Sequence, residues 1–170
     1  MVHLAFGSQS RVGKDTAVDY LIQTYGGTKV AFALPLHNIL TYVQQELGFK
    51  VQKDREFLQL LGDWAKTLNP NVFVEKLLQK VHEEKGNVLV TDVRYPAEFH
   101  ALKKEGFVLV KINRQKRVVS PYRHVRLHSS ETSLEDAPWD YVVSNNGTLA
   151  ELYPKLDRIY LLNGGLPAFP

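Results

Sequence analysis

Five short apolar segments, separated by stretches of helical periodicity, constrain the fold of this chain more than any other feature. Each apolar segment is four to six residues long, which is too short for an ordinary helix and typical of a strand buried on both faces. The predicted strands cover residues 2–6, 29–33, 87–92, 107–112 and 141–144. The predicted helices cover residues 14–25, 36–47, 54–68, 69–84, 95–105 and 148–161.

This alternation predicts an α/β fold. Strands that alternate with helices are joined by right-handed crossovers, which give a mostly parallel sheet with helices on both faces. Ligands of such sheets bind beyond the carboxyl ends of the strands. Chemically distinctive residues do follow the predicted strands, at positions 7–16, Asp92, Arg94, Arg114 and 145–147.

The segment GSQSRVGKDT after the first strand is a candidate phosphate-binding loop. The usual pattern is G-x-x-x-x-G-K-[ST], and Gly13 and Lys14 match it. The hydroxyl comes one residue late, as Thr16, and the first glycine one residue early, as Gly7. Backbone N–H groups at a helix start bind phosphate oxygens, so Lys14 would reach the β- and γ-phosphates of ATP and Thr16 would hold Mg²⁺. The alternative is a plain glycine turn before a helix whose first turn contains Asp15.

Composition limits the other possibilities. A chain of 170 residues without cysteine fits one domain, here residues 1–162 with a tail at 163–170, and has neither disulfides nor thiolate metal sites. No apolar run is long enough to cross a membrane, so we expect a soluble, cytoplasmic protein. The net charge of +3 is mild, which makes nucleic acid an unfavoured partner, although the basic stretch 111–126 could bind a polyanion.

Several segments together resemble one enzyme family, the phage-type deoxynucleoside monophosphate kinases. The phosphate loop has a basic residue, Arg11, two positions before Gly13, as in that family. The other matching segments, in the same order as in the family, are Arg55–Trp64, Val90–Glu98, His128–Asp136 and Val142–Leu152.

The resemblance implies a three-layer P-loop kinase fold with a parallel sheet of about five strands. It implies the reaction ATP + dNMP → ADP + dNDP with Mg²⁺, in the host cytoplasm if the source is viral. Substrate-side helices would span about residues 36–84 and a basic lid about residues 113–130. A homodimer is compatible with the sequence, which does not determine the oligomeric state.

The resemblance also assigns roles to individual residues. The planar guanidinium fork of an arginine suits a phosphate, and Arg55 and Gln59 share a helix face that could hold an acceptor phosphate and base. The predicted catalytic residues are Lys14, Arg11, Arg94, Arg117, Arg123 and Arg126. The predicted ATP ligands are Gly7, Gly13, Lys14, Asp15, Thr16, Asn146 and Gly147, and the predicted Mg²⁺ ligands are Thr16 and Asp92. The predicted acceptor ligands are Arg55, Gln59, Trp64, Asp92, Arg94 and Glu131.

Structural alternatives remain for these residues. Asp92 could cap a turn, Arg94 could form a surface ion pair, Trp64 could pack in the core, and the lid could be a solvated loop. Three rival functions also remain open: a kinase of another small metabolite such as dephosphocoenzyme A, a nucleotide-binding protein without an acceptor, and a nucleic-acid end kinase.

Overall fold

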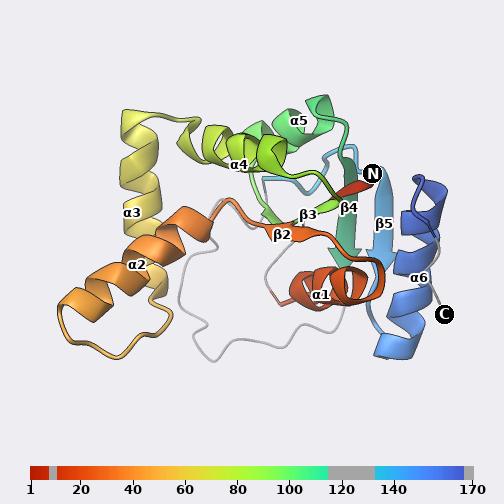
Figure 1. The fold of residues 1–170 in the computed structure, drawn as a ribbon, viewed down its shortest axis with the longest axis horizontal. Coiled ribbons are helices and arrows are strands. Elements are labelled where there is room, and N and C mark those ends of the chain that lie inside the picture. Colours follow the sequence, from red (N-terminus) through yellow and green to blue (C-terminus); the bar gives the residue numbers. More distant parts are fainter. Residues whose placement is uncertain (8–10, 115–132, 167–170) are drawn as a thin grey trace.

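The computed structural model describes residues 1–7, 11–114 and 133–166, and a five-stranded parallel sheet forms its centre (Figure 1). The strand order is β2-β3-β1-β4-β5, and every neighbouring pair is parallel. The strands are β1 (His3–Gly7), β2 (Thr28–Val30), β3 (Val88–Val93), β4 (Val108–Asn113) and β5 (Tyr141–Ser144). The helices are α1 (Lys14–Tyr25), α2 (Leu34–Glu46), α3 (Arg55–Leu68), α4 (Val72–Glu83), α5 (Pro96–Lys104) and α6 (Leu149–Leu162).

Helices cover both faces of the sheet, so the three-layer α/β prediction is confirmed. Helices α1 and α6 share a core cluster with one face, and α4 and α5 share a second cluster with the other. In Figure 1, α2 and α3 extend away from these layers on the side of β2. They form the part of the chain that the sequence assigned to the acceptor.

Burial on both faces explains the apolar sequence of the central strand β1. Side chains of a strand alternate between the two faces. In β1, Leu4 and Phe6 belong to the cluster under α1 and α6, whereas Ala5 belongs to the opposite cluster. All three are at most 1% exposed. Burying a leucine or phenylalanine side chain contributes about 1.5–3 kcal/mol, so a polar residue at either position would be costly.

The fourth helix starts later than the sequence indicated. The sequence predicts a helix from residue 69, because Asn69 followed by Pro70 is typical of an N-cap and first helical residue, but α4 begins at Val72 and its N-cap is Asn71. The side chain of Asn69 accepts a hydrogen bond from the N–H of Asn71 at 2.9 Å, which makes a local turn before the helix. The prediction was wrong by two residues because an asparagine can stabilise a turn as well as cap a helix.

No helix within residues 1–7, 11–114 and 133–166 has the length and apolar character needed to cross a membrane.

Candidate active site

The predicted phosphate loop lies between β1 and α1. β1 ends at Gly7 and α1 begins at Lys14, with Gly13 as its N-cap. Gly13 has a φ of 101°, a left-handed conformation that glycine adopts without strain. The first turn of α1 leaves backbone N–H groups without helical partners, which suits a bound anion. Lys14 is buried, with 8% of its surface exposed.

Gly7 is required by packing. A Cβ atom there would clash with the ring of Trp139 and lie 2.8 Å from the carbonyl oxygen of Val93. The Trp139 ring also meets Phe99 of α5 edge-to-face, with 5.0 Å between ring centroids. The early position of this glycine therefore reflects the close approach of a tryptophan to the end of β1.

Strand register places the loop beside the predicted acceptor residues. Gly7 at the end of β1 is the register partner of Val93 at the end of β3. Asp92 and Arg94 flank Val93, and they therefore lie at the same edge of the sheet as the phosphate loop. This confirms the expectation that parallel strands bring these segments together.

Asp92 fastens the start of α2 to β3. Its two carboxylate oxygens accept hydrogen bonds from the N–H groups of Phe32 and Ala33, both at 2.9 Å. Burial raises the pKa of Asp92, although these two hydrogen bonds and the charge of Arg94 oppose the rise. Each carboxylate oxygen keeps a second lone pair, so the turn-capping role leaves capacity for a cation.

A buried carboxyl group holds the turn that carries Arg94. Glu98 accepts hydrogen bonds from the N–H groups of Arg94 at 2.7 Å and Tyr95 at 3.0 Å. Desolvation by burial raises the pKa of Glu98 to about 7. From the other side, the hydroxyl of Ser133 donates to the carbonyl oxygen of Arg94 at 2.5 Å. The backbone of Arg94 is therefore fixed by two separate segments.

One face of α3 is directed toward this turn. The ammonium group of Lys66 lies 3.7 Å from the centroid of the Tyr95 ring, a cation–π contact. Arg55 and Gln59 lie eleven and seven residues before Lys66, about three and two helical turns away, so all three share that face. The structure thus brings the Arg55–Gln59 pair to the side of α3 that meets the Arg94 turn.

Trp64 lies on the opposite face of α3. It is nine residues from Arg55, about two and a half turns, and is 57% exposed. Leu60 and Leu68, one turn before and after it, are 73% and 70% exposed. The structure therefore does not bring Trp64 together with Arg55 and Gln59, and it also places Trp64 outside the core.

His37 of α2 is a site residue that no sequence motif indicated. Its pKa is lowered mainly by burial and further by the charges of Lys53 and Arg94, while Asp92 opposes the change. His37 therefore lies close enough to Asp92 and Arg94 for their charges to act on its pKa. A lone histidine in an amphipathic helix gives no signal from which this position could be recognised.

Arg114 directly follows β4 at the same edge of the sheet. Its Nε is buried and has no hydrogen-bond partner among residues 1–7, 11–114 and 133–166. A buried guanidinium nitrogen left unsatisfied is costly, so a ligand oxygen at this position would be favourable. An arginine in this state, beyond the carboxyl end of a strand, fits a site for phosphate oxygens.

Arg11, Asp15 and Thr16 are exposed. Asp15 pairs with Lys29 at 3.3 Å, and Thr16 follows it in the first turn of α1. Arg11 adopts a φ of 64°, unusual for a residue with a side chain. This conformation turns the chain just before Val12 and Gly13, so the loop reaches the start of α1 through a strained residue.

The turn after β5 precedes α6. Asn146 and Gly147 are exposed and lead into a capping box formed by Thr148 and Glu151. The neighbouring Asn145 is buried and donates a hydrogen bond from its side chain to the carbonyl oxygen of Val12 at 2.8 Å. The sequence marked the turn 145–147 and named Asn146 and Gly147 as ATP ligands, but it gave no sign that Asn145 contacts Val12.

Four predicted residues lie outside the described part of the chain: Arg117, Arg123, Arg126 and Glu131.

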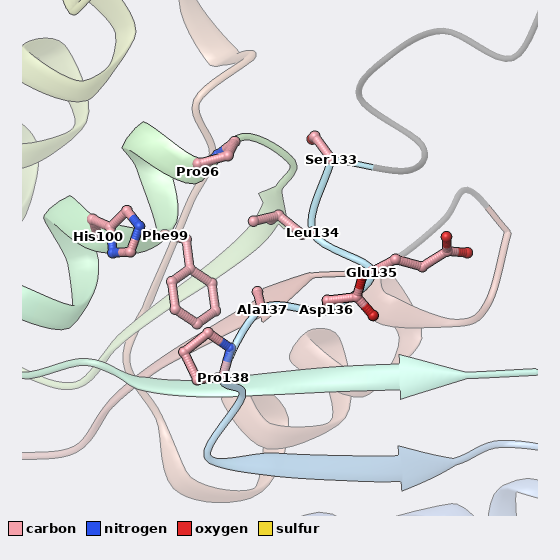
Figure 2. Close-up of a pocket in the computed structure, with 9 residues that line it drawn as sticks. All are labelled: Pro96, Phe99, His100, Ser133, Leu134, Glu135, Asp136, Ala137 and Pro138. Atoms are coloured by element: carbon pink, nitrogen blue, oxygen red, sulfur yellow. The ribbon is translucent and has the colours of Figure 1, made fainter.

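A separate pocket of about 280 Å³ lies between α5 and the segment that precedes β5 (Figure 2). The ring of Phe99 and the side chains of Leu134 and Pro138 form much of its wall, with the carboxylates of Glu135 and Asp136 at its edge. It contains none of the residues predicted from the sequence for the site, so we assign it no part in the site.

The oxygen atoms of the two predicted metal ligands are of the kind that binds magnesium. Thr16 and Asp92 offer hydroxyl and carboxylate oxygens, the hard ligands that Mg²⁺ prefers, and a buried carboxylate with a raised pKa is stabilised by a cation. Among the residues that the structure describes, no three metal-binding side chains gather into a cluster. Magnesium in kinases typically uses one or two protein ligands and completes its shell with water and substrate phosphates.

The fold and the loop define a P-loop protein of the kinase class. The structure is similar to a dephospho-CoA kinase from Campylobacter jejuni, with a TM-score of 0.53 at 13% identity over 94% of this chain and 95% of the other. It is similar to a shikimate kinase from Bacteroides thetaiotaomicron, with a TM-score of 0.52 at 13% identity over 95% and 97%. A tunicamycin resistance protein from Deinococcus radiodurans gives a TM-score of 0.54 at 14% identity over 99% of both chains. At these identities the likeness concerns the fold alone.

Sequence comparison identifies the family. Residues 55–156 match the family model described as deoxynucleotide monophosphate kinase, and the chain belongs to this family. The chain is also 35% identical over 155 residues to an uncharacterized protein, ORF77, of Ictalurid herpesvirus 1 (strain Auburn). The match covers 86% of this chain and 65% of that relative. The family resemblance drawn from the sequence is thus confirmed.

Proposed function

We propose that this protein transfers the γ-phosphoryl group of ATP to a deoxynucleoside monophosphate, giving ADP and a deoxynucleoside diphosphate. One observation carries the proposal: the register of Gly7 with Val93 sets the phosphate loop beside Arg94. A donor phosphate on the loop and an acceptor phosphate on Arg94 would then face each other at one edge of the sheet. Family membership supports this assignment.

An acceptor of this kind requires no strong general base. A phosphate monoester has a second pKa of about 6 and is largely dianionic near pH 7, so it attacks without losing a proton. Catalysis then requires that the two phosphates be positioned and their charge neutralised. Among the described residues, Lys14, Arg94 and Arg114 supply positive charge at this edge.

The donor side of the site is the loop and α1. Backbone N–H groups at the start of α1 hold phosphate oxygens, and Lys14 contacts the β- and γ-phosphates. Thr16 and Asp92 would hold Mg²⁺, which when bound neutralises charge on the phosphates. Arg114 would satisfy its buried Nε with a phosphate oxygen. Asn146 and Gly147 would contact the adenine.

The acceptor side lies between α3 and the Arg94 turn. Arg94 binds the acceptor phosphate, with Arg55 as a second cation on the α3 face that meets this turn. Gln59, one helical turn from Arg55, is placed to read a base edge through its amide. His37, whose pKa is lowered mainly by burial, would add a hydrogen-bonding imidazole near Asp92 and Arg94. We propose that these elements form one domain over residues 1–162.

The direct test is a substrate panel. Purified protein is incubated with ATP, Mg²⁺ and each natural deoxynucleoside monophosphate, and both ADP and the diphosphate are quantified by chromatography. We expect at least one monophosphate to be converted stoichiometrically with ADP release. Dephosphocoenzyme A and a 5′-hydroxyl oligonucleotide serve as rival acceptors. ADP release that no acceptor stimulates, or conversion of a rival acceptor alone, would contradict the proposal.

A further inference from the structure

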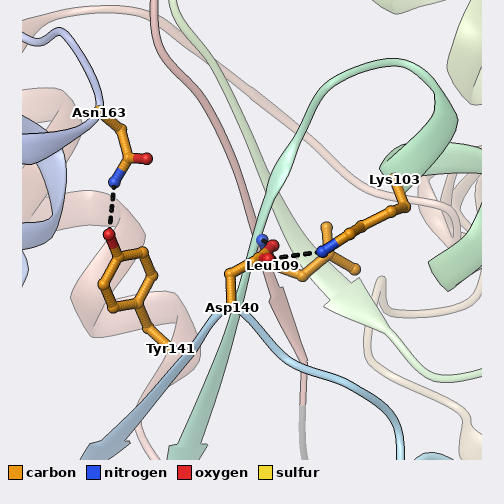
Figure 3. A network of polar contacts seen from close by, with 5 residues as sticks. All are labelled: Lys103, Leu109, Asp140, Tyr141 and Asn163. Carbon is orange, nitrogen blue, oxygen red and sulfur yellow. Dashed lines mark hydrogen bonds and ion pairs between the residues drawn. The ribbon is translucent and has the colours of Figure 1, made fainter.

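Strand β5 is anchored at both of its ends. Before β5, Asp140 accepts hydrogen bonds from the N–H of Leu109 at 2.9 Å and from the ammonium of Lys103 at 2.5 Å (Figure 3). Nearby, the side-chain amide of Asn163 donates to the hydroxyl of Tyr141 at 3.3 Å. The chain just after β5 is held by Asn145, and the two anchors differ in what they contact. The first joins the start of β5 to β4 and α5, whereas Asn145 contacts the phosphate loop.

Asn145 reaches the loop from a buried position. It is 6% exposed, and its backbone N–H donates to the carbonyl oxygen of Asn113 at 2.7 Å, which extends the pairing of β4 with β5. Its side-chain nitrogen Nδ2 donates to the carbonyl oxygen of Val12 at 2.8 Å. The same nitrogen lies 2.5 Å from the point that a Cβ atom at Gly13 would occupy. The amide therefore covers one side of the Val12–Gly13 peptide.

The geometry of the peptide bond determines the direction in which the N–H of Gly13 points. In a planar trans peptide, the carbonyl bond and the following N–H bond point in opposite directions. Because the Val12 carbonyl points toward Asn145, the N–H of Gly13 points away from it. That N–H belongs to the segment at the start of α1 that would hold phosphate.

We propose that Asn145 is a positioning residue that orients the Gly13 N–H toward the phosphates of the nucleotide. This inference rests on the proposed function, because it assigns the ligand of that N–H. An asparagine suits the task because its amide donates a hydrogen bond without bringing charge. A carboxylate there would repel both the Val12 carbonyl and a bound polyphosphate. Since Asn145 directly precedes Asn146 and Gly147, it also links the adenine side of the site to its phosphate side.

The test compares Asn145→Asp with Asn163→Asp. Both variants exchange a donating amide for a carboxyl group, but Asn163 bonds Tyr141 and Ile159 outside the loop. We expect Asn145→Asp to weaken the binding of Mg·ATP and of tripolyphosphate at least tenfold in calorimetry. Its KM for ATP should rise by a similar factor while its KM for the monophosphate changes less than twofold. Asn163→Asp should match the wild-type protein in all three quantities.

A measurement on the unmodified chain covers the case in which Asn145→Asp does not fold. With selective ¹⁵N-glycine labelling, the Gly13 amide resonance should shift when Mg·ATP or tripolyphosphate is added, more than that of Gly106, which follows α5. An unshifted Gly13 resonance at saturating ATP would overturn the inference, as would wild-type ATP affinity in Asn145→Asp. A wild-type protein that binds no ATP would instead defeat the proposed function, so the two failures are distinguishable.

Discussion

The carboxylate of Glu98 accepts a hydrogen bond from the backbone N–H of Arg94 at 2.7 Å, so a buried acid holds the turn that presents the proposed acceptor ligand. Burial raises the pKa of Glu98 from an ordinary 4.5 to about 7. The folded state therefore binds a proton more tightly than the unfolded state does. The stability from this proton is fully present below pH 4.5 and is lost as pH rises through about 7.

Glu98→Gln should reduce this pH dependence. A glutamine keeps an acceptor for the turn but cannot ionise, so the variant does not lose this stability as the pH rises. The stability of Glu98→Gln relative to wild type should therefore increase by about 1 kcal/mol or more from pH 5 to pH 8. Urea unfolding at the two pH values measures the difference. The exposed Glu46→Gln is the matched control and should show no such trend. An unchanged difference between wild type and Glu98→Gln would contradict the prediction.

Lys14 should be essential for phosphoryl transfer. Lys14 is buried, so truncation to alanine would also remove packing. Lys14→Met keeps most of the side-chain stem and removes the charge. We expect kcat to fall by about a hundredfold or more, the range seen when one preorganised charge-stabilising group is lost. The melting temperature should stay within a few degrees; near-wild-type turnover would exclude Lys14 from the site.

Arg94 should act on the acceptor more than on ATP. Arg94→Lys keeps the charge but loses the planar fork that binds phosphate through two hydrogen bonds. We expect the KM for the monophosphate to rise about tenfold or more, or kcat to fall comparably, with the KM for ATP changing much less. Steady-state kinetics with each substrate varied in turn separates these effects. Equal changes in both KM values would assign Arg94 a general structural role.

The two faces of α3 should differ in function. Arg55 lies on the face that meets the Arg94 turn, and Trp64 lies on the opposite, exposed face. We expect Arg55→Ala to raise the KM for the monophosphate severalfold more than Trp64→Ala does. Arg55→Lys should recover part of the loss, because a cation remains. A larger effect from Trp64→Ala would place the acceptor on the other side of the helix.

Much of the fold was predictable because the strands are buried on both faces. Ala5, between Leu4 and Phe6, had to be apolar because it faces the second core cluster, and such runs identify parallel strands directly. The start of α4 was misplaced because the propensity of Asn69 fits a turn and a cap equally well. Residue propensity alone does not reveal whether the Asn69 side chain caps the helix or accepts a hydrogen bond within a turn.

The site was predictable where chemistry depends on backbone shape. Gly13 and Lys14 follow from the loop pattern, and Asp92 and Arg94 follow from their place at and just after the end of a strand. The position of His37 and the contact of Asn145 with Val12 were not predictable, because both depend on residues distant in the sequence. The position of Trp64 could not be predicted without knowing which face of α3 meets the Arg94 turn. The contact of Lys66 with Tyr95, which exists only in the folded chain, identifies that face.

Calorimetric titration with Mg·ATP tests the central claim most directly, because it asks only whether the loop around Gly13 and Lys14 binds a nucleotide. The wild-type protein should give a saturable isotherm with one site per chain and a Kd below the millimolar range, and Lys14→Met should weaken it markedly. Absence of saturable heat from folded wild-type protein, together with an unchanged melting temperature at millimolar Mg·ATP, would contradict the account.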